Sequence, residues 1–444
     1  MKQKTTAPIF MKLKPALFWI VTFLPLIILT ILIFKYYVGV PFWDEWDFVG
    51  LLQKSYLSKV NFSDFSSYHN EHRPFFPRLI LLGLAYLTGY RILPELILNL
   101  LLAIGIFISL FYLFKLIFSA FKIKNYLQFV PVISLVVFSL TQWENWLWGW
   151  QVQIFLNLFT VVTGLKILSL RKIKLSNLLK GMFLGIVATF SFANGLIYWI
   201  IGLIILKFKK QKNKNIILIF WSAFSILVFF LYTHLSPGSE ALKANFSVQN
   251  IFLLTIYIFA FIGAPLVSMN GAGALVAGLT GVLFFIYLII IARKLLLQKI
   301  TLFMPIIALS SYSLMSAFLT SLGRYRLGLL QAISSRYVSF SNLFWLSLLA
   351  ILFIIKENTF LSQRKQGKKT VKMAKILYFL IILAIFINSI LRSRNFSKQY
   401  HYLAPARGAL INGENDEMLG RLYHNIEELK LKREFLKKYK LNVF

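Results

Sequence analysis

Acidic residues gather in one short segment, PFWDEWDF at 41–48, which contains Asp44, Glu45 and Asp47. A carboxylate can take the proton from an attacking hydroxyl, and a neighbouring carboxylate can adjust its pKa or bind a metal ion. The segment follows an apolar stretch, so its carboxylates are expected at the membrane edge, where a lipid headgroup would be presented. These three acids are therefore candidate catalytic residues. The alternative is a solvated loop anchored by interfacial tryptophans.

The same loop continues with SSYHNEHRPFFPRL at 66–79, which adds two histidines, an acid and two arginines. On a helix, His69 and His72 would share one face, and imidazole and carboxylate are common metal ligands. The candidate metal ligands are Asp44, Asp47, His69 and His72, with Mg²⁺ or Mn²⁺ as the ion. The alternative is that they are hydrogen-bonded surface groups, which is the commoner role of such residues in a polar loop.

A tryptophan-rich segment, TQWENWLWGWQVQ at 141–153, places four indole rings beside an acid and several amides. Indole stacks on the C–H faces of sugars, and amides and carboxylates hydrogen-bond sugar hydroxyls. The candidate sugar-binding or acceptor-binding residues are Trp143, Glu144, Asn145, Trp150 and Gln151. An aromatic belt at the membrane surface has the same composition, and the sequence does not separate these two interpretations.

Arginines without any acid occur in SLGRYRLGLLQAISSRY at 321–337, which contains Arg324, Arg326 and Arg336. We expect this segment on the outer side of the membrane, where basic residues are disfavoured, so a specific demand must place them there. The planar guanidinium group suits multidentate recognition of phosphate. The segment therefore predicts a site for a lipid phosphate or pyrophosphate. Ion pairing with the acids of the first loop and general phospholipid contact are the alternatives.

The composition assigns these segments to a membrane protein. Of the 444 residues, 58% are hydrophobic and 14% are charged, and the mean hydropathy is +0.72. Soluble domains are about 25% charged, so a soluble, disordered, fibrous or nucleic-acid-binding chain is excluded. The absence of cysteine excludes disulfides, thiolate metal sites and a cysteine nucleophile. The predicted fold class is an all-α polytopic membrane protein.

Apolar stretches predict about eleven membrane-spanning helices, with interfacial helices in the first outer loop. The first span, near 17–34, is too long for an export signal and shows no cleavage site, so we expect it to be retained. The others lie near 96–114, 126–141, 151–165, 178–192, 195–206, 216–233, 272–292, 302–320, 337–355 and 376–391. A further stretch, 250–269, is expected to be an interfacial or re-entrant helix broken at Gly263, Ala264 and Pro265. A spanning helix is the alternative there.

The net charge of +33 is mainly a signal of orientation. Segments assigned to the cytoplasm hold 27 of the 48 Lys and Arg residues and one of the 15 acids, whereas the outer loops hold 10 basic and eight acidic residues. This asymmetry follows the positive-inside rule. It predicts a transmembrane unit over 1–391, whose first outer loop covers 38–94. The odd number of spans predicts that the polar tail over 392–444, with a helix near 416–439, faces outward, whereas its own net charge of +5 would favour the cytoplasm.

The order of these elements resembles the bacterial GT-C superfamily of membrane glycosyltransferases. The resemblance covers about 15–118: a first span, the outward acids, HRPFFPRL at 72–79, a short interfacial helix ending in glycine, and a second span opening near RILPELILNL at 91–100. This order is similar to that of the aminoarabinose and mannosyl transferases of the superfamily. Beyond this first quarter, the resemblance rests on the number of spans, the arginines and the outward tail.

The resemblance implies an inverting transferase that uses a polyprenyl-phosphate-linked sugar donor at the outer face of the bacterial inner membrane. Asp44 would be the general base, with Glu45 and Asp47 supporting it. The donor phosphate would be bound by Arg324, Arg326, Arg336, His72 and Arg73. The tail is too short for the large outer domain of some members, which favours a glycolipid or cell-envelope glycan acceptor. Metal dependence varies across the superfamily and is not implied.

Two other functions on the same class of lipid are alternatives. A lipid-linked oligosaccharide flippase or transporter would need polar or charged residues facing a path through the spans, and most charges here lie at loop edges. An O-antigen-type polymerase or ligase would be dominated by one large central outer loop with arginines. In this chain the acids lie in the first outer loop instead.

Overall fold

The computed structural model describes residues 15–235, 247–298, 300–357 and 365–444, and these form helices joined by short turns. The only β-type pairing within these ranges is a single bridge between His69 and His72. Some residues that entered the charge count lie outside the described residues, namely the lysines before residue 15, Glu240, Lys243, Lys299 and Arg364. The expected all-helical class is confirmed for the described part of the chain.

Nine stretches of the described chain are long and apolar enough to cross a membrane, which supports the expected polytopic architecture. Five are formed by the single helices α1 (Pro15–Tyr36), α5 (Ile92–Ala120), α11 (Lys214–His234), α13 (Gly271–Gln298) and α18 (Lys365–Asn412). Two more, Ile300–Leu327 and Leu329–Lys356, consist mainly of α14 (Ile300–Arg324) and α16 (Val338–Lys356). The eighth joins η4 (Gly149–Gln151) to α8 (Val152–Leu168), and the ninth is a run of η2 (Tyr126–Phe129), α6 (Val130–Val137), η3 (Leu140–Gln142) and α7 (Trp143–Leu147).

Two further predicted spans form shorter helices. They are α9 (Leu175–Thr189) and α10 (Gly195–Lys207), of 15 and 13 residues, and a short break at 190–194 separates them. At 1.5 Å per residue, each is about 20 Å long, whereas the hydrocarbon core of a bilayer is about 30 Å thick. The predicted number of about eleven spans thus corresponds to nine long stretches and these two short helices, whose length alone does not establish a crossing.

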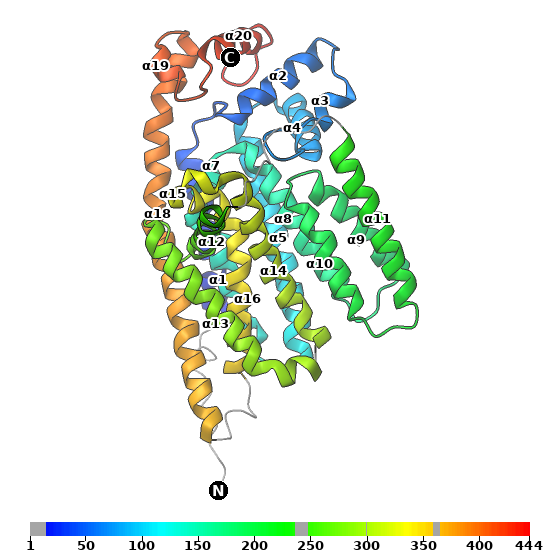
Figure 1. Cartoon of the computed structure of the whole chain (residues 1–444). Helices are drawn as coiled ribbons and strands as arrows, with labels where there is room; N and C mark the ends of the chain where they lie inside the picture. The colour runs from blue at the N-terminus through cyan, green and yellow to red at the C-terminus, as the bar shows by residue number, and fades with distance from the viewer. Residues whose placement is uncertain (1–14, 236–246, 299, 358–364) are drawn as a thin grey trace.

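The stretch expected to lie at the interface forms α12 (Val248–Gly263), which ends at the predicted glycine break. Helix α12 is seen end-on in Figure 1, so it runs across the long helices of the bundle. Irregular backbone within a membrane protein needs internal hydrogen-bond partners. The side chain of Asn388 in α18 supplies them by donating to the carbonyls of Ala264 and Pro265 at 3.1 and 3.0 Å. The interfacial or re-entrant placement of α12 stays a prediction.

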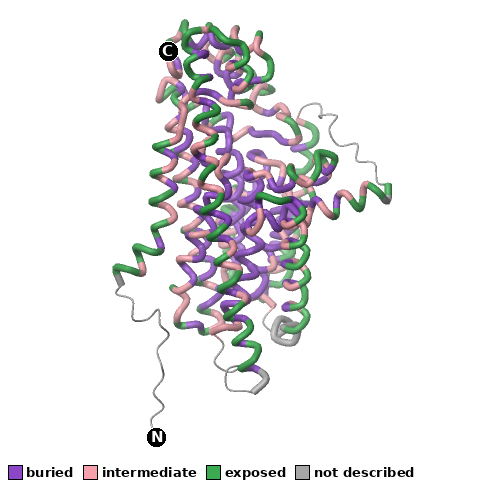
Figure 2. The backbone as a smooth tube through the Cα atoms, turned by 90° about the vertical axis from the view of Figure 1, so that its left-hand side faces the viewer, coloured by how far each residue is buried: buried purple, intermediate pink, exposed green. Residues whose placement is uncertain are grey.

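The interior of the bundle is built around α16. In the apolar part of the stretch that contains α16, 94% of the residues are buried, whereas 17% are buried in the apolar part of α1. Figure 2 shows the buried residues gathered in the middle of the bundle and the exposed ones on its outer helices. Exposed apolar residues such as Phe220 and Phe229 of α11 are stable in a bilayer, because lipid tails solvate them as well as a protein core does.

The first outer loop and the tail meet at one end of the bundle (top of Figure 1). The loop forms α2 (Asp44–Tyr56), α3 (Phe62–Ser66) and α4 (Phe75–Thr88), and the tail forms α19 (Asp416–Leu419) and α20 (Ile426–Lys438). The 48-residue α18 continues past the predicted boundary at 391 and carries the tail to this end. The backbone N–H of Asn442 then donates to the carbonyl of Gly89 at 2.8 Å. The tail is therefore an extension of the last helix that docks on the first loop.

Candidate active site

Helix α2 begins at the acidic segment and turns its acids in different directions. Asp44 and Asp47 are three residues apart and so share a face, whereas Glu45 lies about 100° around the helix. The face with Glu45 packs into the protein, and the face with the two aspartates lines a cavity. Negative charge at the amino end of a helix is also favoured by the helix dipole. Local helix geometry therefore decides which acids reach the cavity.

The cavity has a volume of about 360 Å³. This volume lies toward the lower end of the range for small-molecule sites. Its lining comes from the first outer loop (Trp43, Asp44, Asp47, Asn70, His72), the second (Gln151, Gln153, Ile154), the α9–α10 break (Phe192), the third outer loop (Arg324, Arg336, Tyr337) and the tail (Tyr423, His424). The acids of an early loop and two of the three arginines of a late loop thus share one pocket.

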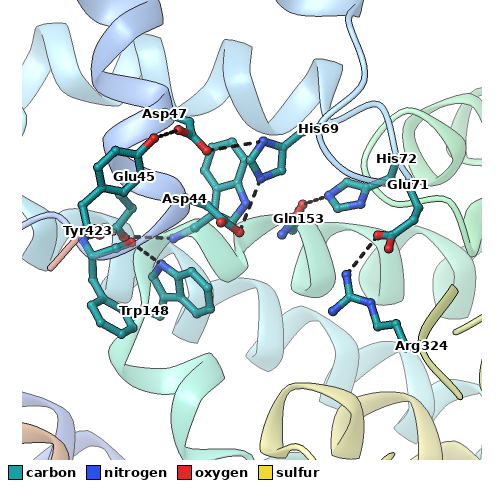
Figure 3. A network of polar contacts seen from close by, with 12 residues as sticks. Asp44, Glu45, Asp47, His69, Glu71, His72, Trp148, Gln153, Arg324 and Tyr423 are labelled. Carbon is teal, nitrogen blue, oxygen red and sulfur yellow. Dashed lines mark hydrogen bonds and ion pairs between the residues drawn. The ribbon is translucent and has the colours of Figure 1, made fainter. Parts of the chain in front are cut away.

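His69 lies beside both aspartates, as Figure 3 shows. Its Nε2 is 3.4 Å from Oδ2 of Asp44, and its Nδ1 is 3.9 Å from Oδ2 of Asp47. The helical arrangement considered for His69 and His72 is wrong, because their backbones pair across a tight turn at 2.8 and 3.2 Å. Asn70 adopts a left-handed φ of 52° in this turn. The turn brings the two imidazole centroids to 5.8 Å.

Asp44 is the acid best placed to act as a base. Burial raises its pKa, but the neighbouring His69 and the positive charge of Arg336 outweigh burial and hold the pKa below its ordinary value of 3.8. The side chain is therefore ionised at neutral pH. It remains 25% exposed, so a hydroxyl in the pocket can reach it.

His72 lines the pocket as a neutral ring. Burial and, to a smaller extent, the nearby His69 lower its pKa to about 3. Its Nε2 lies 2.6 Å from Oε1 of Gln153, an oxygen that only accepts, so the ring proton is committed there. The remaining ring nitrogen is an acceptor. The expected role of His72 in binding a donor phosphate does not fit this geometry, because a phosphate needs hydrogen-bond donors.

Two arginines line the pocket, and nearby carboxylates neutralise their positive charges to different extents. Arg324 ends α14, pairs with Glu71 at 2.9 Å and donates to the hydroxyl of Tyr337 at 2.7 Å. Arg336 lies in the turn η7 (Ser335–Tyr337) with its guanidinium 5.7 Å from the ring of Trp148. Among the described residues, no carboxylate forms an ion pair with Arg336. Arg336 therefore offers the less neutralised positive charge.

The other two arginines expected at a donor phosphate lie outside the pocket. Arg326, in η6 (Tyr325–Leu327), is exposed and donates to the hydroxyl of the adjacent tyrosine at 3.0 Å. Arg73 is fully buried, and its guanidinium donates to the carbonyls of Ser66 and Tyr232 at 2.6 and 2.7 Å. Arg73 thus fastens the first outer loop to α11. Because its guanidinium is bonded to these backbone carbonyls and is not part of the pocket lining, Arg73 does not face a phosphate in the pocket.

The tryptophan-rich segment braces the pocket more than it lines it. The side chain of Glu144 accepts from Oγ of Ser335 at 2.5 Å, and that of Asn145 donates to the carbonyl of Arg336 at 3.2 Å. These contacts fix the turn that carries Arg336. Of the five residues expected to bind sugar or acceptor, which are Trp143, Glu144, Asn145, Trp150 and Gln151, only Gln151 lines the pocket. The short helix α7 carries Trp143, Glu144 and Asn145 and η4 carries Trp150, and none of these four is part of the pocket lining.

Glu45, expected to support catalysis, is buried behind the pocket. Its Oε2 accepts from the backbone N–H of Phe42 at 2.7 Å and its Oε1 from that of Trp150 at 3.1 Å. A Cβ on Gly149 would lie 2.8 Å from Glu45 Oε1 and 2.1 Å from Glu95 Oε2, so only glycine fits beside these neighbouring carboxyl groups. Burial raises the pKa of Glu45 to about 8. Glu45 therefore links α2 to the second outer loop and does not face the pocket.

The tail supplies two pocket residues that sequence reasoning missed. The hydroxyl of Tyr423 donates to Oδ1 of Asp47 at 2.6 Å. The ring of His424 lies 6.2 Å from that of Trp43, with an angle of 29° between the planes. No motif marks either residue. The only sequence signal was the odd number of spans, which assigned the tail to the same side as the first loop.

Asp44, Asp47 and His69 form a group that could bind a metal ion. One ligand atom from each lies within 4.8 Å of the others. Two carboxylates and an imidazole suit Mn²⁺ or Zn²⁺, whereas Mg²⁺ prefers oxygen ligands alone. His72, the fourth expected ligand, is not part of this group. The donor set fits a metal without requiring one.

The pocket combines an ionised carboxylate, an arginine that has no carboxylate partner in the described part of the chain, and aromatic walls. Such a combination can accept a proton and stabilise a phosphate in one enclosed space. No protein-family model, no curated protein and no solved structure matches the chain.

Proposed function

We propose that the chain is a membrane glycosyltransferase that moves a sugar from a polyprenyl-phosphate carrier to a glycolipid or cell-envelope glycan at the outer face of the inner membrane. One observation supports this proposal most. Asp44 and Asp47 line the same pocket as Arg324 and Arg336, although most of the bundle separates them in the sequence. A base and a phosphate site in one pocket are the two requirements of transfer from a phosphate-linked sugar.

The reaction in this proposal is a direct displacement at the anomeric carbon of the donor. The acceptor hydroxyl loses its proton to Asp44 while its oxygen bonds to that carbon. The bond between the carbon and the phosphate oxygen breaks, and the phosphate leaves with the electron pair. Arg336, with Arg324 beside it, stabilises the charge that develops on the phosphate. Attack from the face opposite the phosphate inverts the configuration of the sugar.

The surface around the pocket suits a substrate anchored in lipid. Helix α4 carries exposed apolar residues, among them Leu87, which is 84% exposed, as expected for a helix lying along a bilayer surface. Leu327 and Leu330, which follow Arg326, are 65% and 74% exposed. These residues support a membrane boundary at the level of the pocket. A polyprenyl chain could then stay in the bilayer while its phosphate enters the pocket.

A metal ion, when bound, would supply Lewis-acid charge stabilisation to the pocket. Asp44, Asp47 and His69 would hold it. Chelation tests this contribution directly. Loss of transfer with a chelator and recovery with Mn²⁺ support the metal site, whereas unchanged transfer removes it from the proposal.

Transfer from radiolabelled donors tests the proposed function. Membranes containing the chain are supplied with a panel of polyprenyl-phosphate sugars and with extracted envelope glycolipids, and membranes with Asp44→Asn serve as the control. We expect one donor to be consumed, with its label moving to a glycolipid or glycan. If no donor is consumed and labelled lipid instead crosses the bilayer of reconstituted vesicles, a flippase replaces the transferase.

A further inference from the structure

The pocket has two chemically different ends. In Figure 3, Tyr423 and Asp47 lie at one side and Arg324 at the other, with His69 between them. The cationic side suits a phosphate. The opposite side carries aromatic rings from the first outer loop and the tail, and the face of an aromatic ring does not bind a phosphate. A second group of different chemistry is therefore expected at the aromatic end.

Trp43 presents an indole to this end of the pocket in an unusual way. It precedes α2 with a φ of 48°, a value rarely adopted by residues other than glycine. The neighbouring Trp46 and Trp150 are 0% and 1% exposed, whereas Trp43 is 45% exposed and lines the pocket. Strained backbone at a pocket is a reason to look for function. The strain here accompanies an aromatic face left open to the cavity.

His424 extends this aromatic surface from the tail. Its ring also lines the pocket and lies nearly parallel to the indole of Trp43, at 6.2 Å and 29°. Two hydrogen bonds fix the tail here, from the N–H of Trp43 to the carbonyl of Leu422 at 2.8 Å and from Tyr423 to Asp47 at 2.6 Å. The aromatic pair is therefore held next to the pocket carboxylates.

We propose that Trp43 and His424 form the binding site for a sugar ring of the acceptor. The naming of the ligand as acceptor rests on the proposed transferase function. Aromatic faces stack on the C–H faces of a sugar, and carboxylates accept hydrogen bonds from its hydroxyls. A sugar on this surface lies near Asp44 and on the opposite side from Arg324. Its hydroxyl is then presented to the base while the donor phosphate occupies the arginine end.

Binding of simple glycosides tests this site without any donor. Methyl glycosides of glucose, galactose, mannose and N-acetylglucosamine are titrated into the purified protein in lipid nanodiscs, and binding is followed by calorimetry. We expect at least one to bind, with a Kd that rises about tenfold in Trp43→Ala and in His424→Ala. Trp19→Ala is the matched control, since Trp19 of α1 is also 45% exposed. That control should leave the Kd within about twofold.

Two results would overturn the inference. One is that no glycoside of the panel binds, and the other is that Trp19→Ala weakens binding as much as His424→Ala. In the transfer assay, the two site variants should raise the KM for the acceptor and leave that for the donor unchanged; the reverse would assign the surface to the donor sugar. A chain that binds glycosides here but consumes no donor would keep this sugar site and lose the proposed transferase function.

Discussion

The acidic start of α2 and the arginine turn at 324–336 reach the same pocket by different structural means. Asp44 and Asp47 stand on one regular helix, so helix geometry alone aligns them. Arg336 stands on an irregular turn held by Glu144 and Asn145, through contacts that link positions 191 residues apart. The acids are therefore positioned locally, whereas the arginine depends on a distant loop.

The two regions also differ in how their charges are neutralised. Both aspartates lie beside His69, and Asp44 keeps a lowered pKa. On the arginine side, Arg324 is paired with Glu71, whereas Arg336 forms no such pair in the described ranges. Under the proposed function, the acids would take the proton and the arginines would bind the phosphate. Variants on the two sides should therefore change different kinetic constants.

The largest effect is expected from Asp44→Asn. Removal of the base should lower kcat about 10³-fold and leave the KM for the donor nearly unchanged, because the phosphate site is intact. Asp64→Asn is the matched control. Asp64 belongs to the same loop, but it forms an ion pair with Lys54 at 2.6 Å and is not part of the pocket lining. A kcat for Asp44→Asn within about threefold of the wild type would show that Asp44 is not the base.

Arg336→Ala should have the next largest effect, a fall of about 10² in kcat/KM for the donor. Arg324→Ala should reduce kcat/KM less, by about tenfold, because Glu71 already neutralises part of its charge. Steady-state titration of the donor measures both. A larger loss for Arg324→Ala than for Arg336→Ala would reverse the assignment of the main phosphate ligand.

Glu144→Gln tests whether the arginine side depends on the second outer loop. It weakens the acceptor for the hydroxyl of Ser335, so the turn carrying Arg336 should become less ordered. We expect kcat/KM for the donor to fall about fivefold, with the KM for the acceptor unchanged. An effect on the acceptor constant alone would instead return Glu144 to an acceptor-binding role.

Glu45 predicts a pH dependence of stability. Its pKa is raised from 4.5 to about 8 in the folded protein. The folded chain therefore holds a proton that the unfolded chain releases above its lower pKa, and this stabilisation is lost as the pH rises through about 8. We expect Tm in detergent to fall between about pH 5 and 8, and to fall less steeply in Glu45→Gln. An identical slope in both proteins would contradict this.

The smallest effect is expected from Arg326→Gln. This side chain is exposed and outside the pocket lining, so kcat/KM for the donor should stay within about twofold of the wild type. The same assay as for Arg336 measures it. A tenfold loss would mean that the donor contacts the surface beyond the pocket.

Sequence patterns predicted the features that depend on local chemistry. Long apolar runs identified the long helices, and the Gly–Ala–Pro break marked the end of α12. The cluster of acids after the first span and the arginines at 324–336 could be identified because charged residues are uncommon at a membrane edge. Two of the three acids and two of the three arginines line the pocket.

Features that depend on packing were not predictable from patterns. Nothing in the residue types separates Glu45 from its neighbours, since its burial depends on Gly149 of another loop. Arg73 has the residue type of a phosphate ligand, but its guanidinium donates to buried backbone carbonyls, and the sequence does not show these contacts. The tryptophan-rich segment has the composition of a sugar site, yet most of it braces the arginine turn. His424 joins the pocket lining only because the tail docks on the first outer loop, and no local sequence pattern predicts this docking.

Donor binding and transfer, measured on the same preparations, test the central claim most directly. Wild type, Asp44→Asn and Arg336→Ala are compared in lipid nanodiscs with a labelled polyprenyl-phosphate sugar. The division of tasks predicts that Asp44→Asn binds the donor as tightly as wild type without transferring its sugar, and that Arg336→Ala binds it about tenfold or more weakly. Transfer by Asp44→Asn at the wild-type rate, or unchanged donor binding by Arg336→Ala, would contradict it.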